Sequence, residues 1–341
     1  MASSIPLVDV RDLKKHFPVQ GKLLRRSAKQ WIRAVDGVSF LVYSRETFSL
    51  VGESGCGKTT TAKMVLRLET PTAGSILFDG RDLERLRPEE LKLYRSSVQA
   101  VFQDPWSSLD PRIRAGAIIA EPLVVNHRPS RKAVEERIAE LLLQVGLNAQ
   151  HAYLYPHQFS GGQRQRVAIA RALSISPRLI VLDEPVSALD VSIRAQILNL
   201  LKDLQDQLGL SYLLIAHNLA TVRYMSHRVA VMYLGKIVET AQTKQLFSHP
   251  QHPYTRALIS ASLDSRPDTD HGKIVLPGEV PSPVNPPSGC AFHPRCSNAL
   301  PHCSETPPVL QEQESGHWVA CHVAENGTVA TAGSFSAEER T

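Results

Sequence analysis

The chain has 341 residues, of which 43% are apolar and 21% are charged. This composition excludes a largely disordered chain, a collagen-like repeat and a disulfide-stapled miniprotein, and the length suggests about two domains. Lysine and arginine number 38 against 33 acidic residues, a balance that is compatible with phosphates, an anionic membrane surface or nucleic acid and selects none of them.

No apolar run is long enough to cross a bilayer as a helix, and residues 1–17 carry charges where a secretory signal would be apolar. We therefore expect a cytoplasmic chain. In that reducing compartment, the five cysteines argue against a disulfide framework.

Residues 1 to about 250 predict an α/β domain. Amphipathic helices are predicted over residues 134–145 and 193–208, and a glycine ends each of them. Because strands and helices alternate, the sheet should be mainly parallel. The predicted buried strands are Thr47–Val51, Val98–Phe102, Leu179–Leu182, Tyr212–Ala216 and Val229–Tyr233.

The composition changes near His249. Residues 250–310 hold 12 of the 23 prolines, which predicts an irregular second unit without a long helix or a central strand. Residues 323–341 are rich in Ala, Gly, Ser, Thr and Glu and are expected to be disordered.

The most specific motif is a glycine-rich loop that follows the strand ending at Val51 and fits G-x-x-x-x-G-K-[ST]. Its glycines would turn backbone N–H groups towards phosphate oxygens, Lys58 would add positive charge at the β- and γ-phosphates, and Thr59 would bind Mg²⁺. A chance glycine-rich turn is the alternative, which the strand before the loop and the helix-forming residues 62–68 after it disfavour. The predicted nucleotide-binding residues are Gly52, Glu53, Ser54, Gly55, Cys56, Gly57, Lys58, Thr59 and Thr60.

A second motif places two carboxylates at the end of the Leu179–Leu182 strand. Asp183 would hold Mg²⁺, and Glu184 would polarise the water that attacks the γ-phosphate. Taken alone, the pair would equally fit solvated acids at a strand end.

A third motif, formed by Ser160, Gly161, Gly162 and Gln163, precedes an alanine-rich helix over Val167–Leu173. Backbone amides at a helix N-terminus form an anion site, although a simple helix-capping loop would look similar. Because this motif lies shortly before the strand with the two carboxylates, the sequence resembles the ATP-binding cassette (ABC) family.

That resemblance implies a P-loop ABC nucleotide-binding domain, with a mainly parallel sheet core, an antiparallel β subdomain and a helical subdomain, followed by a Cys/Pro-rich C-terminal extension. It also implies roles for single residues. Gln103 resembles the residue that senses Mg²⁺ and contacts the membrane partner, Asp190 belongs to the D-loop, His217 resembles the switch histidine at the γ-phosphate, and Phe17 resembles the aromatic that stacks on adenine. Without the family order, His217 would be an ordinary strand-end histidine and Phe17 a core aromatic. The implied catalytic set is Glu184, His217, Lys58 and Gln103, and the implied Mg²⁺ set is Thr59, Gln103 and Asp183.

Four cysteines, Cys290, Cys296, Cys303 and Cys321, lie among histidines near the end of the chain. They predict a metal site rather than disulfides, with unligated thiols as the alternative. Their spacing does not distinguish zinc from iron–sulfur. The fifth, Cys56, belongs to the phosphate loop and is not expected to be a ligand.

The stretches His252–Leu258 and Gly289–Cys296 resemble the C-terminal extension of oligopeptide and dipeptide ABC importer ATPases, and the likeness spans about residues 5–323. It implies the second of the two ATPases of such an importer and favours a [4Fe-4S] cluster on the four cysteines, with zinc as the alternative. The expected division is a nucleotide-binding domain over 5–248, the extension over 249–323 and a tail over 324–341.

The resemblance implies an ATPase that powers di- or oligopeptide import from the cytoplasmic face of the inner membrane. Its partners would be a second ATPase subunit, two transmembrane permease subunits and, indirectly, an extracytoplasmic solute-binding protein; no nucleic acid is expected. The alternatives are a soluble ABC ATPase acting on ribosomes or DNA, an exporter ATPase, a metal or redox sensor, and an importer of nickel, heme precursors or glutathione.

Overall fold

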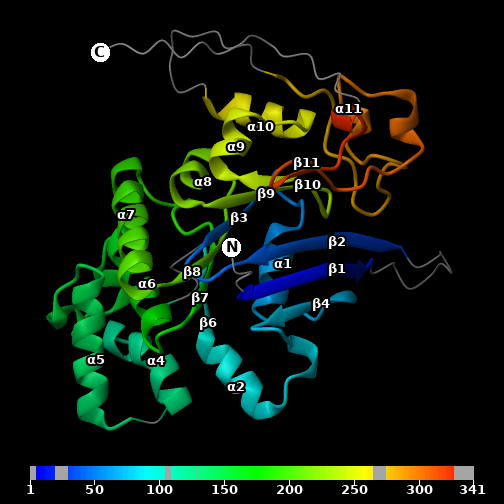
Figure 1. Ribbon diagram of the computed structural model, residues 1–341. Coiled ribbons are helices and arrows are strands. Elements are labelled where there is room, and N and C mark those ends of the chain that lie inside the picture. The colour runs from blue at the N-terminus through cyan, green and yellow to red at the C-terminus, as the bar shows by residue number, and fades with distance from the viewer. Residues whose placement is uncertain (1–4, 20–29, 104–108, 128, 264–273, 326–341) are drawn as a thin grey trace, which may run out of the picture.

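The structure is a computed structural model that describes residues 5–19, 30–103, 109–127, 129–263 and 274–325. Within these ranges the strands form two sheets, a main sheet in the order β11-β12-β10-β9-β3-β8-β7-β6 and a smaller one in the order β2-β1-β4-β5 (Figure 1). The main-sheet strands are β3 Thr47–Val51, β6 Val98–Val101, β7 Leu179–Asp183, β8 Ser211–Ile215, β9 Arg228–Tyr233, β10 Lys236–Gln242, β11 Gln311–Glu314 and β12 His317–Val319. The strands of the smaller sheet are β1 Val8–Pro18, β2 Trp31–Val42, β4 Ala73–Phe78 and β5 Arg81–Asp82.

The centre of the main sheet is parallel. Strands β6, β7, β8, β3 and β9 pair in this order, each parallel to its neighbour. They are the five strands predicted from the sequence, with bounds within one residue of the expectation. Their carboxyl ends meet at one edge, which is where an α/β sheet binds ligands.

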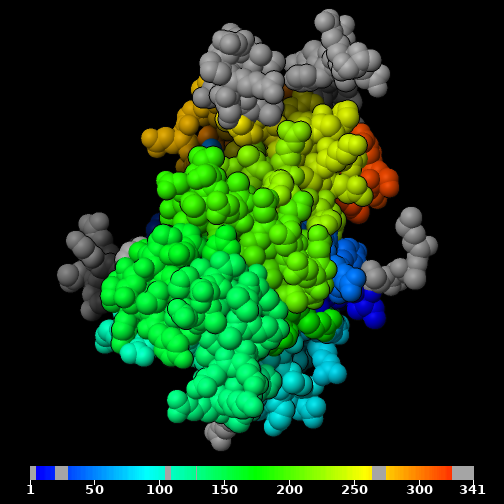
Figure 2. Space-filling view, turned by 90° about the vertical axis from the view of Figure 1, so that its left-hand side faces the viewer, coloured from blue at the N-terminus to red at the C-terminus, as the bar shows by residue number. Residues whose placement is uncertain are grey.

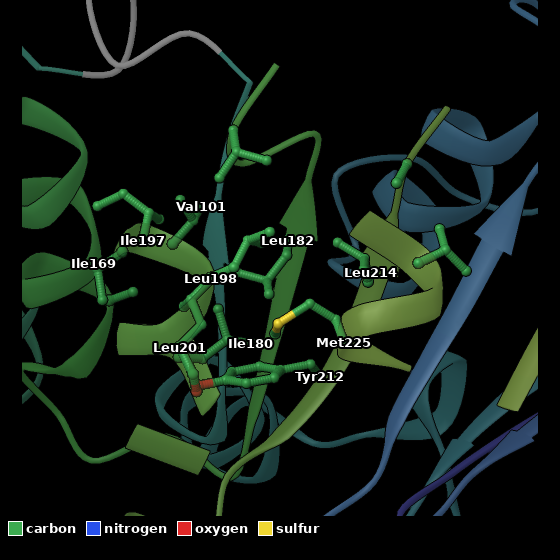
Figure 3. Close-up of a cluster of buried hydrophobic side chains, with 14 of the residues drawn as sticks. Val101, Ile169, Ile180, Leu182, Ile197, Leu198, Leu201, Tyr212, Leu214 and Met225 are labelled. Atoms are coloured by element: carbon green, nitrogen blue, oxygen red, sulfur yellow. The ribbon is translucent and has the colours of Figure 1, made fainter. Parts of the chain in front are cut away.

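The two faces of the sheet build two separate hydrophobic cores. Along β7, Ile180 and Leu182 join one core whereas Leu179 and Val181 join the other, because successive side chains of a strand point to opposite faces. Figure 3 shows Ile180 and Leu182 in the first core, where they lie among Ile197, Leu198 and Leu201. Each face therefore holds its own set of helices.

The first face is covered by a helical layer, seen in green in Figure 2. It consists of α4 Ala115–His127, α5 Arg131–Gln144, α6 Gly161–Leu173 and α7 Val191–Leu208, and α8 Leu219–Met225 and α9 Thr243–Ser248 continue it. Both predicted helices are confirmed as α5 and α7, and the glycines that follow them, Gly146 and Gly209, have the positive φ typical of a helix stop. The opposite face carries α1 Lys58–Val65, α2 Pro88–Ser97 and the smaller, antiparallel sheet.

The proline-rich segment is more regular than the sequence predicts. Pro253 begins the helix α10, Pro253–Leu263, so the expectation of no long helix after residue 250 is wrong. Proline is tolerated at the first position of a helix, because its missing N–H has no partner there in any case. Further along, β12 pairs with β10 and β11 with β12, so the chain returns to the main sheet.

The chain from α10 onwards contributes to the same core as the sheet. Tyr254 and Phe292 are fully buried in the core that contains Ile180 and Tyr233. The last described helix is α11, His322–Glu325, which extends three residues into the segment 323–341 that is expected to be disordered; residues 326–341 lie outside the described ranges. The helices described here do not include one with the length and hydropathy of a transmembrane span.

Candidate functional site

The glycine-rich loop connects β3 to α1 in a shape that requires glycine. Gly52 and Gly57 have φ values of 149° and 109°. A Cβ atom on Gly52 would lie 2.2 Å from the carbonyl oxygen of Met232, and one on Gly57 would lie 2.3 Å from that of Ala34. These close approaches to backbone atoms leave no room for a side chain, which explains both glycines of the motif.

Lys58 is buried and lies across its own loop. Its Nζ donates hydrogen bonds to the carbonyl oxygens of Gly52 at 2.8 Å and Glu53 at 3.0 Å. The neighbouring Cys56 is also buried, and burial raises the pKa of its thiol, so that it adds no negative charge to the loop. The loop thus presents one cation and the backbone amides at the start of α1, which together suit a phosphate chain.

The two oxygen groups expected to bind Mg²⁺ meet at the edge of the sheet. The Oγ1 of Thr59 lies 3.4 Å from the Oδ1 of Asp183, although 124 residues separate them in the chain. Burial and the neighbouring Glu184 raise the pKa of the Asp183 carboxyl. A hydroxyl and a carboxylate are the ligand types that Mg²⁺ prefers, so the residues fit this ion.

Glu184 and His217 also meet, as the sequence predicts. They follow β7 and β8, which are neighbours in the sheet, and the Nδ1 of His217 lies 3.0 Å from the Oε2 of Glu184. The Glu184 backbone has a φ of 50°, in the left-handed region, and its N–H donates to the carbonyl of Ile215. The histidine is half exposed whereas the carboxylate is mostly buried, and a small hollow beside them is lined by both residues and by Arg194, which the sequence analysis did not select.

The Ser160 motif caps α6 and points to solvent. The Ser160 Oγ accepts a hydrogen bond from the N–H of Gln163 at 3.3 Å, and the Gln163 Oε1 accepts one from the N–H of Ser160 at 3.0 Å. Ser160 and Gly161 are exposed. Since α6 packs on the face of the main sheet opposite to α1, this motif is not part of the same core as the phosphate loop (Figure 1).

Three further predicted residues, Phe17, Gln103 and Asp190, lie on different elements, and no contact between them and the phosphate loop is described. Phe17 is the last residue but one of β1, pairs with Ile32 and has the Nζ of Lys15 4.9 Å from its ring centre. Gln103 is exposed two residues after β6, and Asp190 is exposed at the N-terminus of α7.

The four C-terminal cysteines lie near one another. Burial raises the pKa of Cys290 to about 11, and the other three thiols, Cys321, Cys303 and Cys296, contribute to this rise. The Cys290 N–H donates to the carbonyl of Cys303 at 2.7 Å. Nevertheless, within the part of the chain that the structure describes, no three Cys, His, Asp or Glu side chains are arranged as a metal site.

Two residues that the sequence analysis did not select as site residues touch the phosphate loop. Arg295 pairs with the carboxylate of Glu53, and Tyr254 accepts a hydrogen bond from the Glu53 N–H. Both lie in stretches quoted for the family resemblance, but no local signal relates them to a loop more than 200 residues away.

The site combines three features on one α/β sheet, which are a phosphate loop, a strand that ends in two carboxylates and the Ser160 motif that caps α6. Together they define the class of ABC nucleotide-binding domains. Residues 35–187 match the family profile described as ABC transporter, and residues 238–303 match that of the oligopeptide/dipeptide transporter C-terminal region. The chain belongs to the ABC transporter ATPase family.

Two curated relatives and one solved structure illustrate the similarity. The oligopeptide transport ATP-binding protein AppF of Bacillus subtilis is 48% identical over 325 residues, which cover 94% of this chain and 98% of AppF. The dipeptide transport ATP-binding protein DppF of Escherichia coli is 46% identical over 316 residues, covering 93% and 94%. The ATP-binding cassette MJ0796, in a dimeric post-hydrolysis state with ADP and Pi, is 29% identical with a TM-score of 0.61, covering 69% of this chain and 98% of that one.

Proposed function

We propose that this chain is an ATPase subunit that powers the import of di- or oligopeptides. The observation that supports this most is the pairing, in one chain, of an ABC domain with the oligopeptide/dipeptide transporter C-terminal region, over nearly the whole length of relatives named for peptide transport. The importer would also contain a second ATPase subunit, either a copy or a paralogue, and two permease subunits. An extracytoplasmic binding protein would deliver the peptide, and this chain would lie at the cytoplasmic face of the membrane.

In the proposed reaction, a water attacks the γ-phosphate of ATP in line with the leaving ADP. Glu184 takes the proton of this water, and His217, 3.0 Å from Glu184, holds the γ-phosphate. Lys58 moves from the carbonyls of its own loop to the phosphates and offsets their charge. Phe17 stacks on the adenine ring.

Thr59, Asp183 and Gln103 would hold Mg²⁺. When bound, this ion would neutralise part of the negative charge of the phosphates. The proximity of Thr59 and Asp183 supports this assignment, and the exposed Gln103 would complete it while contacting the permease.

We also propose that each ATP is enclosed by two chains. Ser160 and Gly161 are exposed at the capped N-terminus of α6, where the first backbone N–H groups of a helix have no partner within the helix, and α6 packs on the sheet face opposite to α1. Such a helix end binds an anion, and the γ-phosphate on another chain's loop would supply it. Asp190, exposed at the start of α7, would lie in the same interface.

For the extension, we propose that Cys290, Cys296, Cys303 and Cys321 hold a [4Fe-4S] cluster with a structural role. Two observations support this proposal. The thiols of Cys321, Cys303 and Cys296 contribute to the raised pKa of Cys290, and the segment that carries them is short of regular structure and rich in proline, so a metal crosslink would stabilise it.

Peptide import is tested by co-expressing this chain with the two permeases and the binding protein and measuring ATP hydrolysis in proteoliposomes. We expect peptide-loaded binding protein to raise the hydrolysis rate several-fold, and Lys58→Ala to abolish the response. Stimulation by nickel or glutathione alone, or by no solute, would contradict peptide import.

The cluster is tested by anaerobic purification followed by iron, sulfide and zinc analysis. We expect about four irons and four sulfides per chain, with broad visible absorption. Cys296→Ser should lose the iron, whereas Cys56→Ser, which changes the only cysteine outside the group, should keep it. One zinc per chain and no colour, or no metal at all, would refute the cluster.

A further inference from the structure

Glu53, the second residue of the phosphate loop, forms hydrogen bonds with two residues of the C-terminal part of the chain. Both carboxylate oxygens of Glu53 accept hydrogen bonds from Arg295, at 2.7 Å to Nη1 and 3.1 Å to Nη2. The Glu53 N–H donates to the hydroxyl of Tyr254 at 2.8 Å. The side chain and the backbone of one loop residue are thus both fixed by the C-terminal part of the chain.

The two residues that contact Glu53 are themselves buried. Tyr254 is fully buried and the Arg295 side chain is 7% exposed. Tyr254, Tyr233 and Phe292 form an aromatic cluster with ring centres 4.8 to 5.4 Å apart. A bidentate ion pair between a guanidinium and a carboxylate in such surroundings has a defined geometry as well as a favourable energy.

The pairing bears on ATP because Glu53 lies inside the loop that receives the phosphates. A free carboxylate at this point would repel a triphosphate, and the partly buried surroundings would screen the repulsion less than water does. Hydrogen bonds from Arg295 to both carboxylate oxygens balance the negative charge and fix the side chain in one position.

Arg295 itself belongs to the segment of the cysteines. It ends a short turn between Cys290 and Cys296, in which the His293 N–H donates to the carbonyl of Cys290 and the Arg295 N–H to that of Phe292. The position of the guanidinium therefore depends on the fold of this segment.

We propose that Arg295 is a positioning residue of the ATP site, which neutralises Glu53 and makes the affinity of the phosphate loop for ATP depend on the C-terminal extension. Tyr254 assists by fixing the Glu53 backbone. The inference requires ATP binding alone and is independent of the transported solute.

The test is the dissociation constant of a fluorescent ATP analogue, measured on the full-length chain. Arg295→Met should weaken binding about tenfold, because it leaves the Glu53 charge unopposed. The double variant Arg295→Met/Glu53→Gln should recover most of the loss, since it removes that charge. As a control, Arg256→Met changes another arginine of the extension, which donates to the carbonyl of Pro250, and should bind the analogue as the parent does.

Three results would each overturn the proposal. They are binding by Arg295→Met within about twofold of the parent, no recovery of affinity in the double variant, and an equal loss of affinity in Arg256→Met. Thermal unfolding shows whether the variants are folded. If Arg295→Met does not fold, the test uses Arg295→Lys instead, because lysine keeps the positive charge but cannot form the bidentate ion pair. We then expect about threefold weaker binding, again restored by Glu53→Gln.

Discussion

At the scale of single residues, the positions of Glu184 and His217 follow from strand order. Each residue comes directly after a strand or one residue beyond it, and β7 and β8 are parallel neighbours, so their carboxyl ends bring the two side chains to 3.0 Å. The neighbouring Asp183 faces Thr59 instead. Two adjacent carboxylates thus have different partners, which supports their different proposed roles.

The proposed role of Glu184 predicts the effect of replacing it with glutamine. Glu184→Gln should bind ATP normally but keep less than about a tenth of the parent turnover, because it cannot accept the proton of the attacking water. Steady-state ATP hydrolysis measures this. Glu89→Gln, at an exposed position on α2, should keep the parent rate. A Glu184→Gln variant that turns over faster than this limit would show that another group is the base.

At the scale of secondary-structure elements, the sequence predicts the parallel strands and the helices α5 and α7 because each has a clear apolar pattern between stop signals. It does not predict α10 or β12. The many prolines of residues 250–310 argue against a helix there, but α10 contains a single proline, at its first position. Strand β12 has only three residues, which are too few for an apolar pattern. The contact between Arg295 and Glu53 spans 242 residues, and no spacing rule relates such positions.

Glu239 on β10 connects these unpredicted elements. Its buried carboxylate accepts hydrogen bonds from the backbone N–H groups of Gln251 and His252, just before α10. Its Oε1 lies 2.7 Å from the Nε2 of His317 on β12. A single carboxylate thus joins α10, β10 and β12.

The surroundings of His252 predict a pH dependence of stability. Burial lowers the pKa of His252 from 6.5 to about 4, and its Nδ1 accepts a hydrogen bond from the N–H of Tyr254. Because the pKa is lower in the folded state, the unfolded state takes up the proton first. The contribution of neutral His252 to the free energy of unfolding is therefore fully present above about pH 6.5, and it is lost as the pH falls towards 4.

Denaturant unfolding at about pH 7 and pH 5 measures this loss, and His252 should account for about 2 kcal/mol of the difference in the free energy of unfolding. His252→Asn, which keeps an acceptor for Tyr254 but does not titrate, should have a shallower pH dependence by that amount. Equal slopes in the parent and the variant would refute the assignment.

At the scale of the whole molecule, the two cores on opposite faces of the main sheet separate α1 from α6. The phosphate loop and the Ser160 motif are the two parts that an enclosed ATP requires under the proposal, and they belong to different faces. If ATP is enclosed in this way, a functional site needs a second chain, and the rate of hydrolysis should rise more steeply than the first power of the protein concentration.

Complementation between defective chains tests this arrangement. Lys58→Ala and Ser160→Arg should each be inactive alone. In a mixture, each mixed dimer combines the intact Lys58 of one chain with the intact Ser160 of the other, so part of the parent activity should return from one site per dimer. If the mixture remains as inactive as its components, the shared site is wrong.

The most direct measurement is the sedimentation of Glu184→Gln with and without ATP, because this variant should bind ATP without consuming it. The central claim is that ATP joins two chains through the phosphate loop of one and the Ser160 motif of the other. It predicts a dimer with ATP and a monomer with ADP, and it predicts that adding Ser160→Arg to Glu184→Gln abolishes the dimer. A monomer with saturating ATP, or a dimer that forms regardless of nucleotide, would contradict the account.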